Sequence, residues 1–169
     1  MTELDQRGSP YYAGLDITPD YLGHQLYLLG CIVHAGSRID DLGTHALAAL
    51  REQFQEAEIG RVLLTIAVAV RTSMDQNPRR AAERLDRVGD DIGTLEYLNE
   101  SRTTARLQIR DACNKLMHCK VLNFDYVDEW AGRGAALNPI VYAYGSLREV
   151  EWKASIDLNK LIHVAFVFT

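Results

Sequence analysis

The sequence predicts an α+β domain that is mainly helical: a bundle of about five helices, then a small C-terminal antiparallel β-hairpin or sheet, then a final helix. Apolar residues recur at helical spacing through residues 18–120, and their period changes to two after residue 120. The chain has 169 residues and is 47% hydrophobic, enough to bury one core without metal or disulfide staples. We therefore expect a single domain spanning residues 1–169.

Composition and charge exclude several classes of protein. The three cysteines are an odd number and form no C-x-x-C pair, which indicates a reduced, cytoplasmic chain. The N-terminus carries Glu3 and Asp5 and has no apolar stretch, so it does not read as a signal peptide. The longest apolar run, residues 62–70, is too short to span a bilayer, so we expect no membrane association. A net charge of −5 argues against a broad nucleic-acid-coating surface and leaves room for a small local site.

The first helix has a clear start signal. Residues 1–17 show no helical period and are expected to form an irregular arm. Thr18 is then placed to cap a helix whose first position is Pro19 and which runs to about residue 39.

Further helices are expected up to residue 120. Residues 41–58 form an amphipathic pattern, and residues 61–71 are apolar on all sides, as in a buried helix, although a buried strand also fits their valines and isoleucines. A capped helix is expected at residues 77–88, where Gly89 ends it. The polar residues 89–104 read as a connector with at most one helical turn.

Residues 121–157 are expected to form the small sheet, because apolar and polar side chains alternate there. The expected strands are residues 121–127, 140–144 and 149–157, with a loop at 128–138. Asp157 is placed to cap the terminal helix of residues 158–169.

The helix expected at residues 107–120 is the best candidate for chemistry. Its apolar face holds Ala105, Ile109, Ala112 and Leu116. The opposite face gathers five polar residues: Arg110, Asp111, Asn114, Lys115 and His118. Because Arg110, Asn114 and His118 follow at four-residue steps, their side chains stack along one stripe on which a phosphate could lie.

Residues 114–118, NKLMH, lie late in a run of helices and resemble the signature of the HEPN superfamily. That signature consists of an arginine, a polar residue that is often asparagine, several further residues and then a histidine. The order IRDACNKLMHCKV, a strand, YxYG and WKAxID is similar to a group of uncharacterised bacterial HEPN-like proteins and covers about residues 107–166. Where the signature has arginine directly before the asparagine, this chain has Cys113, and its nearest arginine is Arg110.

The resemblance implies a cytoplasmic homodimer in which both motifs face a shared cleft. It implies either a metal-independent ribonuclease or an RNA-binding protein of a bacterial toxin or phage-defence system, with RNA and a protein from a neighbouring gene as partners. The second hypothesis is a non-catalytic dimeric interaction module of the same fold. A homodimer is also expected because the polar stripe and the apolar tail VAFVFT leave surface for a two-fold partner.

Each candidate residue has a chemical role in the ribonuclease hypothesis. His118 would move the proton of a 2′-hydroxyl or of the leaving oxygen, because imidazole is the side chain that ordinarily titrates near neutrality. Arg110 would meet the negative charge that gathers on phosphorus, with Lys115 as a weaker substitute. Asn114 would bind a phosphate oxygen or fix the imidazole tautomer. The structural alternative is that Asn114 and His118 tie the helix to the next strand, while Asp111 and Lys115 form a surface pair.

No cofactor or metal is expected. Cys113, His118 and Cys119 lie on one helix at spacings that do not converge on a tetrahedral metal site. The sequence also contains no glycine-rich phosphate loop.

Overall fold

The computed structural model describes residues 18–41, 45–98, 103–127 and 136–169. These residues form helices, one sheet and a final 3₁₀ turn. In chain order the elements are α1 (Pro19–Asp41), α2 (His45–Gln76), α3 (Pro78–Val88), β1 (Asp91–Tyr97), β2 (Thr104–Gln108), α4 (Ile109–His118), β3 (Val121–Val127), β4 (Ala136–Leu147), β5 (Val150–Asp157), α5 (Leu158–Ala165) and η2 (Phe166–Phe168). The predicted α+β class with mainly helical content is confirmed.

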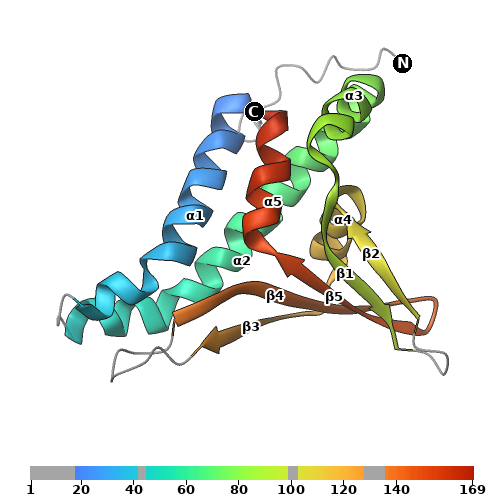
Figure 1. The fold of residues 1–169 in the computed structure, drawn as a ribbon. Coiled ribbons are helices and arrows are strands. Elements are labelled where there is room, and N and C mark those ends of the chain that lie inside the picture. Colours follow the sequence, from blue (N-terminus) through green and yellow to red (C-terminus); the bar gives the residue numbers. More distant parts are fainter. Residues whose placement is uncertain (1–17, 42–44, 99–102, 128–135) are drawn as a thin grey trace, which may run out of the picture.

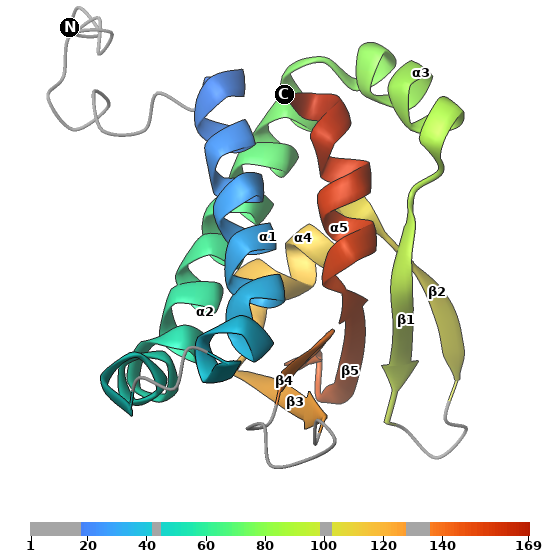
Figure 2. The same cartoon turned by 60° about the vertical axis from the view of Figure 1, so that its left-hand side comes forward.

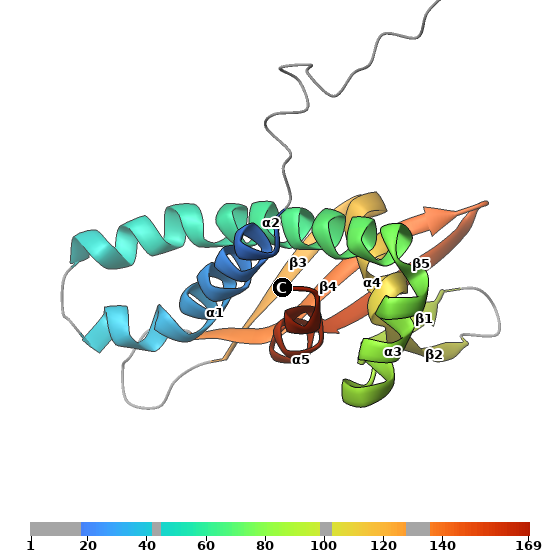
Figure 3. The ribbon, with the colours of Figure 1, turned by 90° about the horizontal axis from the view of Figure 1, so that it is seen from above.

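The five strands form one antiparallel sheet in the order β2-β1-β5-β4-β3. Helices α1, α2 and α5 stand on one face of it, and α5 rises directly from the end of β5 (Figures 1 and 2). Seen from above, α2 runs along one margin of the molecule and α5 lies between α1 and α3 (Figure 3). Helix α4 connects β2 to β3 and packs against α2 and the sheet.

The core lies between the helices and the inner face of the sheet. The alternation predicted for the third strand is confirmed in β5, where Trp152, Ala154 and Ile156 are buried. They join the same apolar cluster as buried side chains of α2 and α5, such as Leu63 and Leu161. A helix gains most of its stability by packing its apolar side against other elements. The shared cluster therefore explains why the helices gather on one face of the sheet.

The connector predicted at residues 89–104 is wrong, because strand β1 lies within it and β2 begins at its last residue. Ile92 and Leu95 are both buried although they are three positions apart, since the pairing of β1 with β2 shifts register between Asp91 and Gly93. This irregularity hides the period of two that marks a strand. The helical bundle predicted for residues 18–120 is therefore interrupted by two strands.

Helix boundaries also differ from the prediction. The two helices expected at 41–58 and 61–71 are one continuous α2, which passes through Gly60, and the buried-strand alternative is wrong. A single glycine inside a helix costs only about 1 kcal/mol, which the buried residues around it offset. Helix α4 begins at Ile109, so Ala105 is not on its apolar face but exposed on β2.

The hairpin between β4 and β5 turns later than predicted. Strand β4 is longer than expected, and the turn is made by Arg148 and Glu149, which both have positive φ angles of 47° and 70°. Two such residues give the backbone twist that a two-residue hairpin needs. The predicted cap is confirmed, since the Asp157 carboxylate accepts hydrogen bonds from the backbone N–H groups of Asn159 and Lys160.

Some expectations lie outside the described residues, namely the irregular arm of residues 1–17 and most of the loop at 128–138. Among the helices that are described, none combines the length and apolar character needed to cross a bilayer.

Candidate functional site

The polar face of α4 opens onto a cleft of about 680 Å³. Helix α4 forms one wall of the cleft. Residues of β1, β4 and β5 form the other wall. The lining residues are Leu95, Tyr97, Asp111, Asn114, Lys115, His118, Ser146, Leu147 and Trp152. Four of the five polar residues predicted to share one helix face therefore line one cleft.

Asn114 and His118 lie one helical turn apart on the α4 wall of the cleft. His118 is exposed, in the last turn of the helix, and Asn114 is half-buried. The structural alternative requires Asn114 or His118 to form a hydrogen bond that ties α4 to β3. Within the described residues, neither side chain forms one. Both groups are thus available to a ligand in the cleft.

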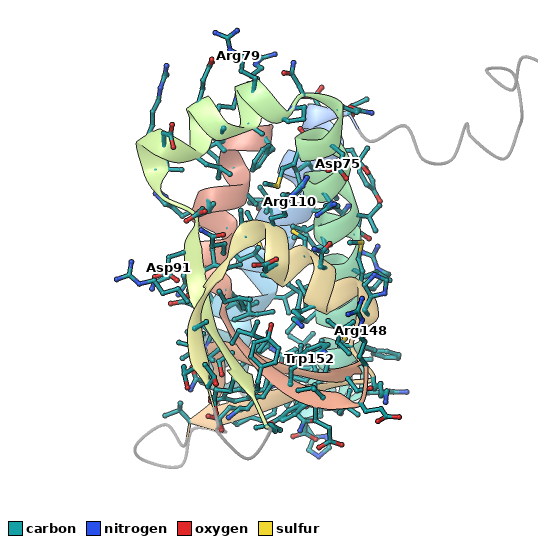
Figure 4. All side chains as sticks on the ribbon, turned by 90° about the vertical axis from the view of Figure 1, so that its right-hand side faces the viewer. Asp75, Arg79, Asp91, Arg110, Arg148 and Trp152 are labelled. Carbon is teal, nitrogen blue, oxygen red and sulfur yellow. The ribbon has the colours of Figure 1, made fainter. Side chains whose placement is uncertain are left out.

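Arg110 lies apart from these two residues. Its Nη1 donates to the Oδ1 of Asp75 on α2 at 3.1 Å, and its Nη2 donates to the same oxygen. Arg71 also binds Asp75, with Nε 2.8 Å from Oδ2. Figure 4 shows Arg110 turned toward Asp75 on one side of α4, while Trp152 lies on the other side. The stripe predicted for Arg110, Asn114 and His118 is therefore divided between two places.

The Asp75 carboxylate is shared by two guanidinium groups. The hydrogen bond and charge of Arg71 and the charge of Arg110 lower the pKa of Asp75, although partial desolvation opposes them.

An aromatic pair faces α4 from the sheet. Tyr97 and Trp152 are direct partners in the pairing of β1 with β5, and Lys115 extends over both rings. Its Nζ lies 4.2 Å from the Trp152 ring centroid and 5.6 Å from that of Tyr97, within cation–π range. Burial lowers the pKa of Lys115, and the charge of Asp111 opposes this shift. Lys115 therefore contacts the aromatic pair instead of forming the ion pair with Asp111 that the structural alternative predicted.

Close packing at Gly145 fixes the position of the Trp152 indole. A Cβ atom added to Gly145 would stand 2.3 Å from Cζ2 of Trp152, so only glycine allows the ring to lie against β4. The alternation predicted for residues 149–157 is compatible with an inward Trp152, but no local pattern assigns Tyr97 or Trp152 to the site. The missing signal was the pairing of two strands 55 positions apart, which no local pattern reports.

Cys113, the residue directly before Asn114, lies in the core. Its exposure is 0%, and burial raises the pKa of its thiol to about 12. The side chain before Asn114 therefore points away from the cleft. A charged group at that position would be buried in an apolar cluster.

The two histidines of α1 lie outside the cleft. His34 has its Nε2 3.0 Å from Oδ1 of Asn159 on α5, and His24 has its Nδ1 3.4 Å from the amide nitrogen of Gln25. Both histidines thus contact polar side chains of this chain. Among the described residues, no group of three or more histidine, cysteine, aspartate or glutamate side chains is placed to hold a metal ion.

Comparisons of the chain with protein-family models, with curated proteins and with solved structures found no match.

Proposed function

We propose that the cleft beside α4 binds a short single-stranded segment of RNA. The observation that carries the proposal is the meeting of three polar residues of α4, Asn114, Lys115 and His118, with the aromatic pair Tyr97 and Trp152 across one cleft. Proteins bind single-stranded RNA by stacking its bases on aromatic rings and pairing its phosphates with cations. The resemblance to the HEPN signature supports the same class of ligand.

Lys115 connects the two walls of the cleft. In the free chain its ammonium group covers the Trp152 ring, which is only 2% exposed. A base that enters the cleft would stack on Tyr97 and displace the ammonium group from the indole. Lys115 would then be free to pair with the adjacent phosphate, and Asn114 could donate to a phosphate oxygen.

We further propose that His118 supports metal-independent cleavage of the bound RNA. The imidazole would accept the proton of a 2′-hydroxyl, whose oxygen then attacks the adjacent phosphorus. The bond from phosphorus to the 5′-oxygen breaks, and that oxygen takes a proton from water. The products are a 2′,3′-cyclic phosphate and a 5′-hydroxyl. Arg110 would assist by leaving Asp75, which is feasible because exposed ion pairs contribute little and Asp75 would keep Arg71.

A non-catalytic dimeric interaction module is the second candidate. It is favoured by the binding of Arg110 to Asp75 and by the burial of Cys113, which leave His118 without an arginine beside it in the free chain. In both candidates we propose a homodimer that works with a protein from a neighbouring gene in a bacterial toxin or defence system. The HEPN resemblance alone supports that biological setting.

RNA binding can be tested with a fluorescently labelled single-stranded RNA and anisotropy measurements. Lys115→Met keeps the aliphatic contact with Trp152 but removes the charge, so it should weaken binding and reduce the slope of log K against log salt concentration by about 0.7. Lys153→Met is the matched control. The Nζ of Lys153 lies 4.7 Å from the ring centroid of Tyr142, and Lys153 does not line the cleft. Equal loss of binding in both variants, or no binding by the parent chain, would reject the RNA proposal.

Cleavage is measured separately, with chelator present. His118→Ala should lower the cleavage rate by about 10²- to 10⁴-fold while RNA binding is retained. Binding without cleavage in the parent chain would favour the interaction module. Equal cleavage by the parent, His118→Ala and Arg110→Ala chains would assign the activity to a contaminant.

A further inference from the structure

Helix α2 has a second apolar stripe on the side that faces away from the core. Its buried side includes Ile59, Leu63 and Ile66. The opposite side carries Leu47, Leu50, Phe54, Ala57, Arg61 and Leu64, all of which are exposed. The exposed fractions of Leu50, Phe54 and Leu64 are 50%, 52% and 49%. A helix that is apolar on two sides normally packs on both.

These six positions follow one another at alternating steps of three and four residues. This is the a/d spacing of a coiled coil, in which each stripe residue meets a residue of a facing helix. The stripe spans 17 helical steps, or about 26 Å at 1.5 Å per residue. We define residues 47–64 of this face as the outer stripe of α2. Seen from above, α2 runs along one margin of the molecule (Figure 3).

We propose that the outer stripe of α2 binds the same stripe of a second copy of this chain, with the two helices antiparallel about a two-fold axis. This inference rests on the homodimer of the proposed function and is independent of RNA binding.

The stripe is complementary to itself when it is reversed. An axis midway between Phe54 and Ala57 places the large Phe54 ring of one copy against the small Ala57 of the other. The same axis sets Leu47 against Leu64, and Leu50 against the aliphatic stem of Arg61. The guanidinium group of Arg61, 2.6 Å from the carboxylate of Glu58, would remain at the rim of the interface.

Charges beside the stripe also favour the antiparallel pair. Arg51 and Glu58 both follow a d-position residue, so they flank the stripe on the same side. In the antiparallel arrangement, Arg51 of each copy lies on the same side as Glu58 of the other, whose carboxylate also binds Arg61 of its own chain. A parallel pair would instead bring both copies of Phe54 together at one level and both copies of Arg61 at another, where like charges repel.

The C-terminal tail, which first suggested a homodimer, does not offer a comparable surface. Val164, Ala165 and Phe168 are buried in this chain's own core, and Phe166 alone of the large tail side chains is strongly exposed, at 65%. One helix pair of this length lies below the area of a standard interface, so we expect a dimer that dissociates on dilution.

The oligomeric state of the full chain tests the inference. Sedimentation equilibrium from low micromolar to several hundred micromolar should show a shift from monomer to dimer. Leu50→Glu and Phe54→Glu place charges in the stripe and should keep the chain monomeric. Phe166→Glu is the matched control, because it changes an even more exposed apolar residue outside the stripe. A monomeric parent throughout, or a dimer that survives both stripe variants, would overturn the proposal.

Cross-linking tests the antiparallel direction. Leu47→Cys and Leu64→Cys are made separately with Cys31→Ser, which removes the exposed native thiol. Under mild oxidation, a mixture of the two variants should form a disulfide-linked pair, whereas each variant alone should not, since identical positions would be about 26 Å apart. Cross-linking of each variant with itself would indicate a parallel pair and reject the inference.

The two proposals can fail independently. Loss of dimerisation in Phe54→Glu with unchanged RNA binding per chain would support the interface and separate it from the cleft. Loss of RNA binding in Lys115→Met with unchanged dimerisation would do the reverse.

Discussion

Replacing Gly145 with alanine should destabilise the protein by forcing Trp152 away from β4. The added Cβ would lie 2.3, 2.8 and 2.9 Å from three indole carbons, while ordinary contact begins at 3.4 Å. The closest carbon must therefore move by at least 1.1 Å, the difference between 3.4 and 2.3 Å. Trp152 is 2% exposed, so its ring has little space except toward Lys115. Overpacking of this kind costs about 1–3 kcal/mol.

The measurement is thermal unfolding followed by circular dichroism. For a domain of this size, the expected cost lowers Tm by about 2–12 °C. Gly30→Ala is the matched control, because Gly30 lies within α1 and its added Cβ would meet nothing closer than Ile162 Cδ1 at 3.9 Å. That variant should gain up to about 1 kcal/mol from helix propensity. If Gly145→Ala unfolds at or above the Tm of the parent, the packing described for Trp152 is incorrect.

Three further predictions concern single groups. Asp157→Ala removes the side chain that caps α5 and should cost about 0.5–2 kcal/mol in urea unfolding, whereas an unchanged midpoint would show that the cap contributes nothing. A thiol reagent at about pH 8 should label exposed Cys31 and spare Cys113 until denaturant is added. The reagent reacts with the thiolate, and burial raises the pKa of the Cys113 thiol to about 12. Labelling of Cys113 before denaturant is added would contradict its burial. Burial and the hydrogen bond to Glu56 raise the pKa of Tyr126 from 10.0 to about 12. The stability that this phenol contributes is therefore complete below pH 10.0, its pKa in the unfolded chain, and is lost as the pH rises from 10.0 to about 12. Ultraviolet titration should show a late phenol that disappears in Tyr126→Phe.

Local patterns predicted those elements whose stabilising contacts are local. The alternation of β5, the Asp157 cap of α5 and the Asn77 cap of α3 each depend on residues within a few positions, and all three are present. The polar face of α4 was predicted for the same reason. Helical geometry alone places Asn114 one turn from His118.

Features that depend on distant pairing were not predictable. β1 lacks a regular period because of its irregular pairing near Gly93, and β2 buries only Leu107, so neither strand shows an alternating pattern. The aromatic wall of the cleft forms only when Tyr97 meets Trp152 across β1 and β5. The direction taken by Arg110 was equally hidden, because it is set by Asp75, 35 positions earlier in the chain. Sequence reasoning therefore located one wall of the site and missed the other.

The central position of β5 in the sheet has a consequence for synthesis of the chain. β5 pairs on one side with β1 and on the other with β4, yet it is made after both. Until it emerges from the ribosome, each of these neighbours presents an open edge of unpaired backbone groups, which favours aggregation. A nascent chain halted before Val150 should therefore be a preferred substrate for chaperones. A circular permutant that moves β5 ahead of β1 would shorten that interval of exposure.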